Sequence, residues 1–141
     1  MMSLTDIQQA FVRRYMNGNE CVNGVRIREI NGENVIRGKV GGDLLLEEGR
    51  QAARATALSI LATLRAELGD LDRIARIVKV FGMVNVAPGF NQTPAVIDGC
   101  SDLLVKVFGE AGRHTRSAVG LAELPFDIAV EIELTARLRS G

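Results

Sequence analysis

The sequence closes with TRSAVGLAELPFDIAVEIELTARL, residues 115–138, and this stretch predicts two neighbouring β-strands joined by a loop at Leu124-Pro125. In the second strand apolar and polar residues alternate, which is typical of a strand that buries one face only. Arg116 lies near the start of the first strand, and Glu131 lies inside the second. Because the planar fork of a guanidinium matches a carboxylate with two parallel hydrogen bonds, Arg116 is a candidate carboxylate-binding residue.

Two long amphipathic helices are predicted before this stretch, over residues 47–68 and 93–108. Gly69 ends the first helix, and Thr93-Pro94 is typical of a helix start with threonine as the N-cap. Cys100 falls on the apolar face of the second helix, so we expect it to be buried rather than reactive. Residues 74–86 are rich in β-branched side chains and predict a buried strand.

The first third of the chain is less regular. Ile7, Phe11 and Tyr15 stand four apart, so residues 4–16 predict a short helix. Residues 20–36 look extended, with a hairpin signal at Asn31-Gly32. Residues 38–42 are glycine-rich, but no lysine and hydroxyl follow at phosphate-loop spacing, so we expect a plain turn.

These elements predict an α+β fold of two layers, with a mixed β-sheet and both long helices on one face. The 141 residues suit a single domain, and 47% of them are hydrophobic. The other sheet face would then be uncovered in an apolar chain, which favours association of subunits through it.

The charge balance argues against a phosphate-binding protein. Lys and Arg together number 17, as do Asp and Glu, and no basic stripe follows the chain, so a nucleic-acid partner is not expected. The two cysteines, Cys21 and Cys100, do not form a metal or disulfide framework. With no membrane-spanning apolar run and no signal-peptide pattern, we expect a cytoplasmic protein.

Several motifs are spread over the chain from residue 38 onward. They are GKVGGDL (38–44), EEG (47–49), VKVFGMVN (78–85), PGF (88–90), FGEAGRHTRSAV (108–119), Leu124-Pro125 and Glu131-Ile132-Glu133. Together these motifs resemble the Rid family, the reactive-intermediate (enamine/imine) deaminases, also called L-PSP endoribonucleases, and in particular a longer and less studied branch of it. The resemblance implies a chorismate-mutase-like fold and a homotrimer, in which three sheets form a central barrel with a cleft at each subunit interface. It implies no metal and no cofactor.

The resemblance also implies site residues. The arginine matching Arg116 binds a substrate carboxylate, and the glutamate matching Glu131 positions the attacking water. Ser117 and Ala118 would contact the substrate, which is a 2-aminoacrylate or a related imino acid that yields a 2-oxo acid and ammonia. Asn23-Gly24 matches the serine–glycine pair that lines the family's pocket.

Residues 1–37 depart from the family pattern. The stretch 18–24 is too polar for a good first strand, and Tyr15 has no confident match among the family's pocket residues. The asparagine that many members carry in the second long helix is replaced around Ser101. These departures bear on catalysis more than on the fold.

Each site residue has a structural alternative. Arg116 could pair with an acid of its own chain, and Glu131 could form an ion pair between subunits. Glu133 shares a strand face with Glu131 and competes for its role. His114 is the only histidine and has no neighbouring nucleophile or ligand in the sequence, which favours an exposed histidine at a loop end.

The leading functional hypothesis is therefore an imine/enamine deaminase that acts on a small carboxylate. The alternative from another class is a homotrimer that binds 2-oxo acids without turnover. RNA cleavage is disfavoured by the zero net charge and the 4% aromatic content.

Overall fold

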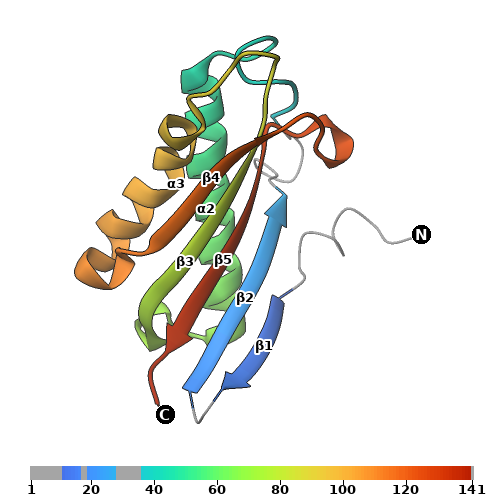
Figure 1. The fold of residues 1–141 in the computed structure, drawn as a ribbon. Coiled ribbons are helices and arrows are strands. Elements are labelled where there is room, and N and C mark those ends of the chain that lie inside the picture. The colour runs from blue at the N-terminus through green and yellow to red at the C-terminus, as the bar shows by residue number, and fades with distance from the viewer. Residues whose placement is uncertain (1–10, 17–18, 28–35, 141) are drawn as a thin grey trace.

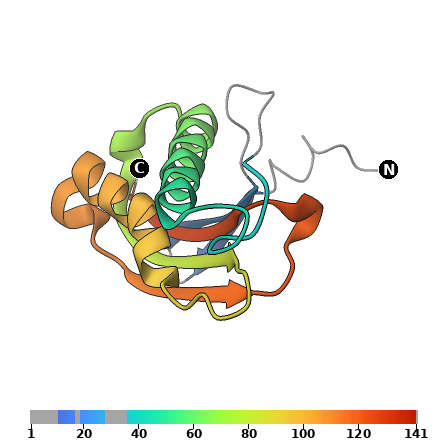
Figure 2. The ribbon, with the colours of Figure 1, turned by 90° about the horizontal axis from the view of Figure 1, so that it is seen from above.

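The computed structural model describes residues 11–16, 19–27 and 36–140, and up to residue 27 it describes the backbone alone. These residues form one mixed five-stranded sheet, in the order β1-β2-β5-β3-β4, with two long helices on one of its faces (Figures 1 and 2). The α+β prediction is confirmed. The elements are β1 (Phe11–Met16), β2 (Asn19–Ile27), α2 (Leu46–Leu68), β3 (Ile74–Asn85), α3 (Thr93–Phe108), β4 (Thr115–Leu121) and β5 (Val130–Leu138).

The sheet is mixed because α3 crosses over between β3 and β4. These two strands are parallel, whereas β1–β2, β2–β5 and β3–β5 are antiparallel. α2 packs over β5 and β2, and α3 packs over β3 and β4. β4 is therefore an edge strand with α3 lying on one side of it.

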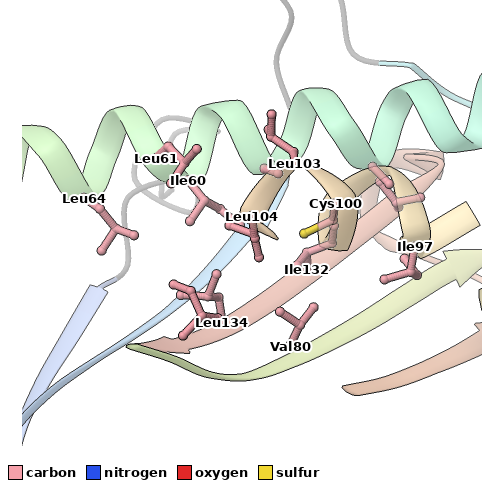
Figure 3. Packing of buried hydrophobic residues seen from close by; sticks show 14 of the residues in the cluster. Ile60, Leu61, Leu64, Val80, Ile97, Cys100, Leu103, Leu104, Ile132 and Leu134 are labelled. Carbon is pink, nitrogen blue, oxygen red and sulfur yellow. The ribbon is translucent and has the colours of Figure 1, made fainter. Parts of the chain in front are cut away.

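The core lies between the helices and the sheet (Figure 3). Cys100 belongs to this core, and burial raises the pKa of its thiol to about 12, opposed only in part by the charge of Arg116. A thiol that stays neutral at physiological pH is a poor nucleophile, so the packing role predicted for Cys100 is confirmed. Its fully buried neighbours in Figure 3 come from both helices and from two strands: Ile60, Leu64, Val80, Ile97, Leu104, Ile132 and Leu134.

The two predicted helices are present, but one cap differs. Gly69 ends α2 with a φ of 83°, as expected of a glycine at this position. The N-cap of α3 is Gln92 rather than Thr93, whose hydroxyl donates a 2.9 Å hydrogen bond to the carbonyl of Ala118. Thr93 therefore joins α3 to β4 instead of capping its own helix.

The predictions for the N-terminal third were confirmed in part. Residues 11–16 form β1 rather than the end of a helix, so that prediction was wrong. Residues 19–27 form β2, which confirms the extended structure predicted from residue 20 as far as residue 27, although residues 18–24 had looked too polar for a good first strand. β2 lies between two partners, β1 and β5, whose hydrogen bonds outweigh the weak local preference of its sequence. The predicted hairpin at Asn31-Gly32 lies outside the described residues.

The face of the sheet away from the helices is open over most of its length. Val119 is 38% exposed there. At one end the β4–β5 loop folds over this face, and Leu124 and Ile128 pack against Met83 and Leu121. In the described parts of the chain, no helix is long and apolar enough to cross a membrane.

The close packing of α3 against α2 at Gly99 leaves no room for a side chain, and Gly99→Ala is expected to destabilise the protein. A Cβ at this position would lie 2.1 Å from the backbone carbonyl oxygen of Arg50, so the helices would have to separate. We expect a net loss of about 1–3 kcal/mol in the free energy of unfolding, measured by urea denaturation.

Ala62→Gly, at an exposed position of α2, is the control for helix propensity and should cost about 1 kcal/mol. If propensity governed position 99, alanine there would stabilise the protein by a similar amount. A stabilised Gly99→Ala variant would therefore contradict the packing argument.

Candidate functional site

Arg116 lies on the helix side of the edge strand β4. Its register partner is Val80, which is fully buried beneath the helices. The Arg116 Nη1 atom donates to Asp98 Oδ1 at 2.7 Å and to Ser101 Oγ at 3.2 Å, and both acceptors belong to α3. The structure thus pairs Arg116 with an acid of its own chain, one of the two alternatives left open by the sequence.

His114 has a partner that the sequence did not reveal. Its Nε2 atom is 2.9 Å from Ser101 Oγ, and its Nδ1 atom is 2.6 Å from the carbonyl oxygen of Gly112. The short helix η2 (Gly109–Gly112) turns the chain back along α3 and so places His114 beside Ser101. The prediction of an exposed histidine without a neighbouring nucleophile was wrong, since His114 is half-buried and both ring nitrogens have a partner.

A hollow of about 360 Å³ opens over this cluster. We call it the α3–β4 hollow. Arg113, at its edge, forms an ion pair with Glu110 at 3.3 Å. Because the side chain of Arg113 is mostly exposed, an incoming anion can still reach it. The hollow is lined by Ser101, Val105, Arg113, His114 and Arg116.

Glu131 and Glu133 lie on the opposite, open face of the sheet. In β5 they alternate with Ile132 and Leu134, which are fully buried under the helices. Glu133 shares a pocket of about 170 Å³ with Ser117, and its other lining residues are Lys79, Phe81 and Thr135. Of the two acids, Glu133 is therefore the one placed beside Ser117.

Glu131 is the acid with the altered ionisation. Burial raises its pKa above the ordinary 4.5, and the charge of Glu133 raises it further. A carboxyl group with a raised pKa is better matched to proton transfer near neutral pH than an ordinary one. The raised pKa therefore fits a role in acid–base chemistry.

One chain does not bring the predicted site residues together. Arg116 faces the helices, Glu131 faces the open side, and β3 separates their strands. Ala118 is half-buried, and its carbonyl is bonded to Thr93. Asn23 and Gly24 lie in β2, opposite Thr135 and Leu134, with β5 and β3 between them and β4.

Three of the sequence motifs meet at one end of the sheet, where a buried amide joins them. Asn85 is fully buried and donates to Asp127 Oδ1 at 2.9 Å. Its own oxygen accepts a 2.9 Å bond from Lys39 Nζ, which also donates to the carbonyl of Ala122. The turn at residues 41–43, the end of β3 and the β4–β5 loop are thus held as a unit.

The β4–β5 loop also contains strained backbone. Phe126 and Asp127 in this loop have φ values of 58° and 56°, a conformation that costs energy for residues other than glycine.

In the described part of the chain, no group of three or more histidine, cysteine, aspartate or glutamate side chains is arranged to hold a metal ion.

The altered ionisation of Glu131 predicts a pH-dependent stability difference. Because its pKa is raised in the folded protein, the folded state binds this proton more tightly than the unfolded chain, and stability falls as pH rises through and above 4.5. Glu131→Gln should therefore be more stable than wild type at pH 7, with the gain vanishing well below pH 4.5. Thermal or urea unfolding at both pH values measures it.

Glu133→Gln is the matched control for the pH experiment. Glu133→Gln removes the charge of Glu133, which is the smaller of the two causes that raise the pKa of Glu131, and leaves the larger cause, burial, in place. Its gain in stability at pH 7 should therefore be smaller than that of Glu131→Gln. A gain for Glu131→Gln that is the same at both pH values would contradict the assigned ionisation.

Comparison with known proteins agrees with this fold. Residues 11–138 match the family described as "YjgF/chorismate mutase-like, putative endoribonuclease". Protein TCP17 of Trypanosoma cruzi is 47% identical over 104 residues, a match that covers 73% of this chain but only 65% of TCP17.

Two solved structures are similar over most of the chain. The protein Atu1372 of Agrobacterium tumefaciens, of unknown function, has a TM-score of 0.84 and 35% identity, covering 94% of this chain and 84% of Atu1372. A Shewanella oneidensis protein whose structure is described as a "putative endoribonuclease" has a TM-score of 0.81 and 30% identity, covering 89% of this chain and 83% of its own. The match over residues 11–138 and these relatives confirm the resemblance on which the motifs were assigned: the chain belongs to the YjgF/chorismate-mutase-like family, within the L-PSP/Rid superfamily.

Proposed function

We propose that this protein binds a small imino acid through its carboxylate at Arg116 and hydrolyses it to a 2-oxo acid and ammonia. The observation that carries the proposal is the ion pair between Arg116 Nη1 and Asp98 Oδ1, at 2.7 Å on the border of the α3–β4 hollow. The side chain of Arg116 is only 24% exposed, so its charge is partly desolvated and favours a carboxylate partner.

The proposed site needs more than one copy of the chain. Arg116 and Glu131 lie on opposite faces of the sheet, so a cleft that contains both requires a second subunit to supply one of them. The open sheet face, with Val119 exposed, provides an apolar surface for such association. These features support association of subunits with the clefts between them, and the family resemblance implies that the assembly is a homotrimer.

The reaction is a hydrolysis without change of oxidation state. Arg116 holds the carboxylate and thereby fixes the imine carbon, and Glu131 orients a water molecule and takes one of its protons. The water oxygen bonds to the carbon and the imine nitrogen takes up the proton, which gives a carbinolamine. The hydroxyl of the carbinolamine then passes its proton through Glu131 to the amine, and the carbon–nitrogen bond breaks to give the 2-oxo acid and ammonia. Imines of this kind also hydrolyse in water, so positioning alone gives a useful acceleration.

The test is release of ammonia or 2-oxo acid from an imino acid generated in the assay by a pyridoxal-phosphate enzyme. We expect faster release with the protein than without it. Equal rates for wild type, Arg116→Ala and no protein would overturn the deaminase. Stabilisation by 2-oxo acids without any acceleration would instead establish a binding protein that lacks turnover.

Asp98 competes with the ligand for Arg116, which gives a prediction that does not depend on catalysis. Asp98→Asn keeps the size of the side chain but removes its charge, so an incoming carboxylate no longer has to displace another. Because partly exposed ion pairs contribute about 0.2–1 kcal/mol, affinity for a 2-oxo acid should rise by up to about fivefold in the limit of full competition. Calorimetric titration with pyruvate measures this change.

Asp102→Asn is the matched control for the competition. Asp102 also lies on α3 and pairs with an arginine, Arg50, at 3.0 Å, but outside the hollow. It should leave pyruvate affinity unchanged. Weaker binding by Asp98→Asn would show that Asp98 orients Arg116 for the ligand rather than competing with it.

A further inference from the structure

The pair formed by Ser101 and His114 belongs to none of the roles assigned above. We propose that Ser101 is an activated nucleophile, with His114 as its general base, and that the α3–β4 hollow accepts small anionic acyl esters. This activity goes beyond imine hydrolysis, which involves no covalent bond to the protein.

The hydrogen bonds of His114 fix which nitrogen carries the proton in the neutral ring. The carbonyl oxygen of Gly112, 2.6 Å from Nδ1, can only accept, so Nδ1 donates to it. The lone pair of Nε2 is then directed at Ser101 Oγ, 2.9 Å away, and accepts the hydroxyl proton. A nucleophile within hydrogen-bond reach of a base that a third group orients is the arrangement of nucleophilic catalysis.

Arg116 completes the environment of Ser101. Its Nη1 atom donates to Ser101 Oγ at 3.2 Å, so a cation lies beside the hydroxyl and favours the loss of its proton to His114. Ser101 is half-buried and borders the hollow. The hydrogen bond between Ser101 and His114 therefore lies at the edge of a hollow that is open to an incoming molecule, with Arg113 and Arg116 beside it.

The lining of the hollow indicates the class of substrate. Val105 is 37% exposed and provides a small apolar contact for an acyl chain. Arg113 and Arg116 favour a negative charge elsewhere on the same molecule. We therefore expect an ester whose acyl part ends in a carboxylate to react faster than a neutral ester of similar size.

The chemical step is balanced by the residues present and by water. Ser101 Oγ bonds to the acyl carbon as its proton passes to His114 Nε2, and the ester carbon–oxygen bond breaks. The leaving alcohol takes the proton from Nε2. Water then attacks the acyl-serine with His114 again as base, releasing the carboxylic acid and restoring Ser101.

The experiment acylates the full chain with p-nitrophenyl hemisuccinate, which is anionic, and with neutral p-nitrophenyl acetate. Nitrophenol release and peptide mass spectrometry measure the rate and the site. We expect one adduct at Ser101, formed faster with the hemisuccinate. Ser101→Ala should remove it, and His114→Asn should slow its formation about 100-fold or more.

Ser59→Ala, a serine of α2 outside the hollow, is the control and should react like wild type. Thermal unfolding shows whether each variant is folded.

A second control uses the wild-type protein alone and compares its native and urea-unfolded forms. The unfolded protein should no longer be acylated selectively at Ser101. Absence of the Ser101 adduct in the native protein, or equal rates for His114→Asn and wild type, would overturn the proposal. Faster acylation by the acetate would overturn its substrate class. The acylation experiment does not measure ammonia release. A negative result for Ser101 is therefore distinct from a negative result for the proposed deaminase.

Discussion

Replacing Arg116 with alanine is expected to weaken the binding of 2-oxo acids, and to lower kcat/KM for imine hydrolysis, by at least about 100-fold. Hydrogen bonds to charged groups contribute about 1.5–3 kcal/mol each, and a carboxylate can accept two from one guanidinium. Calorimetric titration with pyruvate measures the affinity, and ammonia release from a generated imino acid measures the rate. The fold should persist, because Asp98, the acid left without its partner, is already 41% exposed.

Two controls separate a carboxylate clamp from a general effect of charge. Arg50→Ala breaks the ion pair between Arg50 and Asp102, which also joins an arginine to an aspartate of α3, and should leave affinity and rate unchanged. Arg116→Lys keeps the charge but loses the planar fork, and should recover only part of the binding. If Arg116→Ala bound pyruvate as tightly as wild type, the carboxylate site would have to lie elsewhere.

Periodicity alone was enough to predict the helices and the second half of the sheet. In β5 the alternation of Ile132 and Leu134 with Glu131 and Glu133 determines which face meets the helices, and the structure buries the two apolar residues completely. The C-terminal end of α2 could also be predicted, because Gly69 adopts a positive φ that other residues rarely take. Strong local patterns of this kind depend little on the rest of the chain.

The N-terminal third could not be predicted in the same way because its structure is determined by distant partners. The spacing of Phe11 and Tyr15 fits a helix, yet both residues lie in β1, which pairs with β2. β2 in turn pairs with β5, more than one hundred residues later in the sequence. A pattern confined to residues 4–16 contains no information on that pairing.

The candidate site was only partly visible in the sequence. Arg116 was singled out by its motif, but its partner Asp98 lies 18 residues earlier. Ser101 and His114 are 13 residues apart, and they meet because η2 turns the chain back along α3. Each pair joins α3 to the chain that follows η2, so these contacts follow from the fold and not from the spacing.

The opposite orientations of Arg116 and Glu131 also follow from register rather than from the motif. Arg116 lies opposite Val80 of β3, whereas Glu131 lies opposite Met83 of the same strand. Val80 and Met83 are three positions apart along the strand, so their side chains point to opposite faces of the sheet. The motif therefore describes one site only if two subunits contribute to it.

Leu64→Ala is expected to have the largest effect on stability, a loss of about 2–5 kcal/mol in the free energy of unfolding. Leu64 is fully buried between α2 and the sheet, on the side of α2 that faces Leu134 in Figure 3. Truncation would remove its apolar contacts and leave a cavity, because the surrounding backbone can collapse only in part. Leu58→Ala is the matched control, since Leu58 lies on the same helix, is 45% exposed and should cost within about 0.5 kcal/mol. Urea unfolding at one fixed protein concentration measures both, because subunit association would otherwise shift the midpoint. Equal losses for the two variants would mean that the exposed side of α2 is itself buried in the assembled protein, and would place a subunit contact on the helices rather than on the open sheet face.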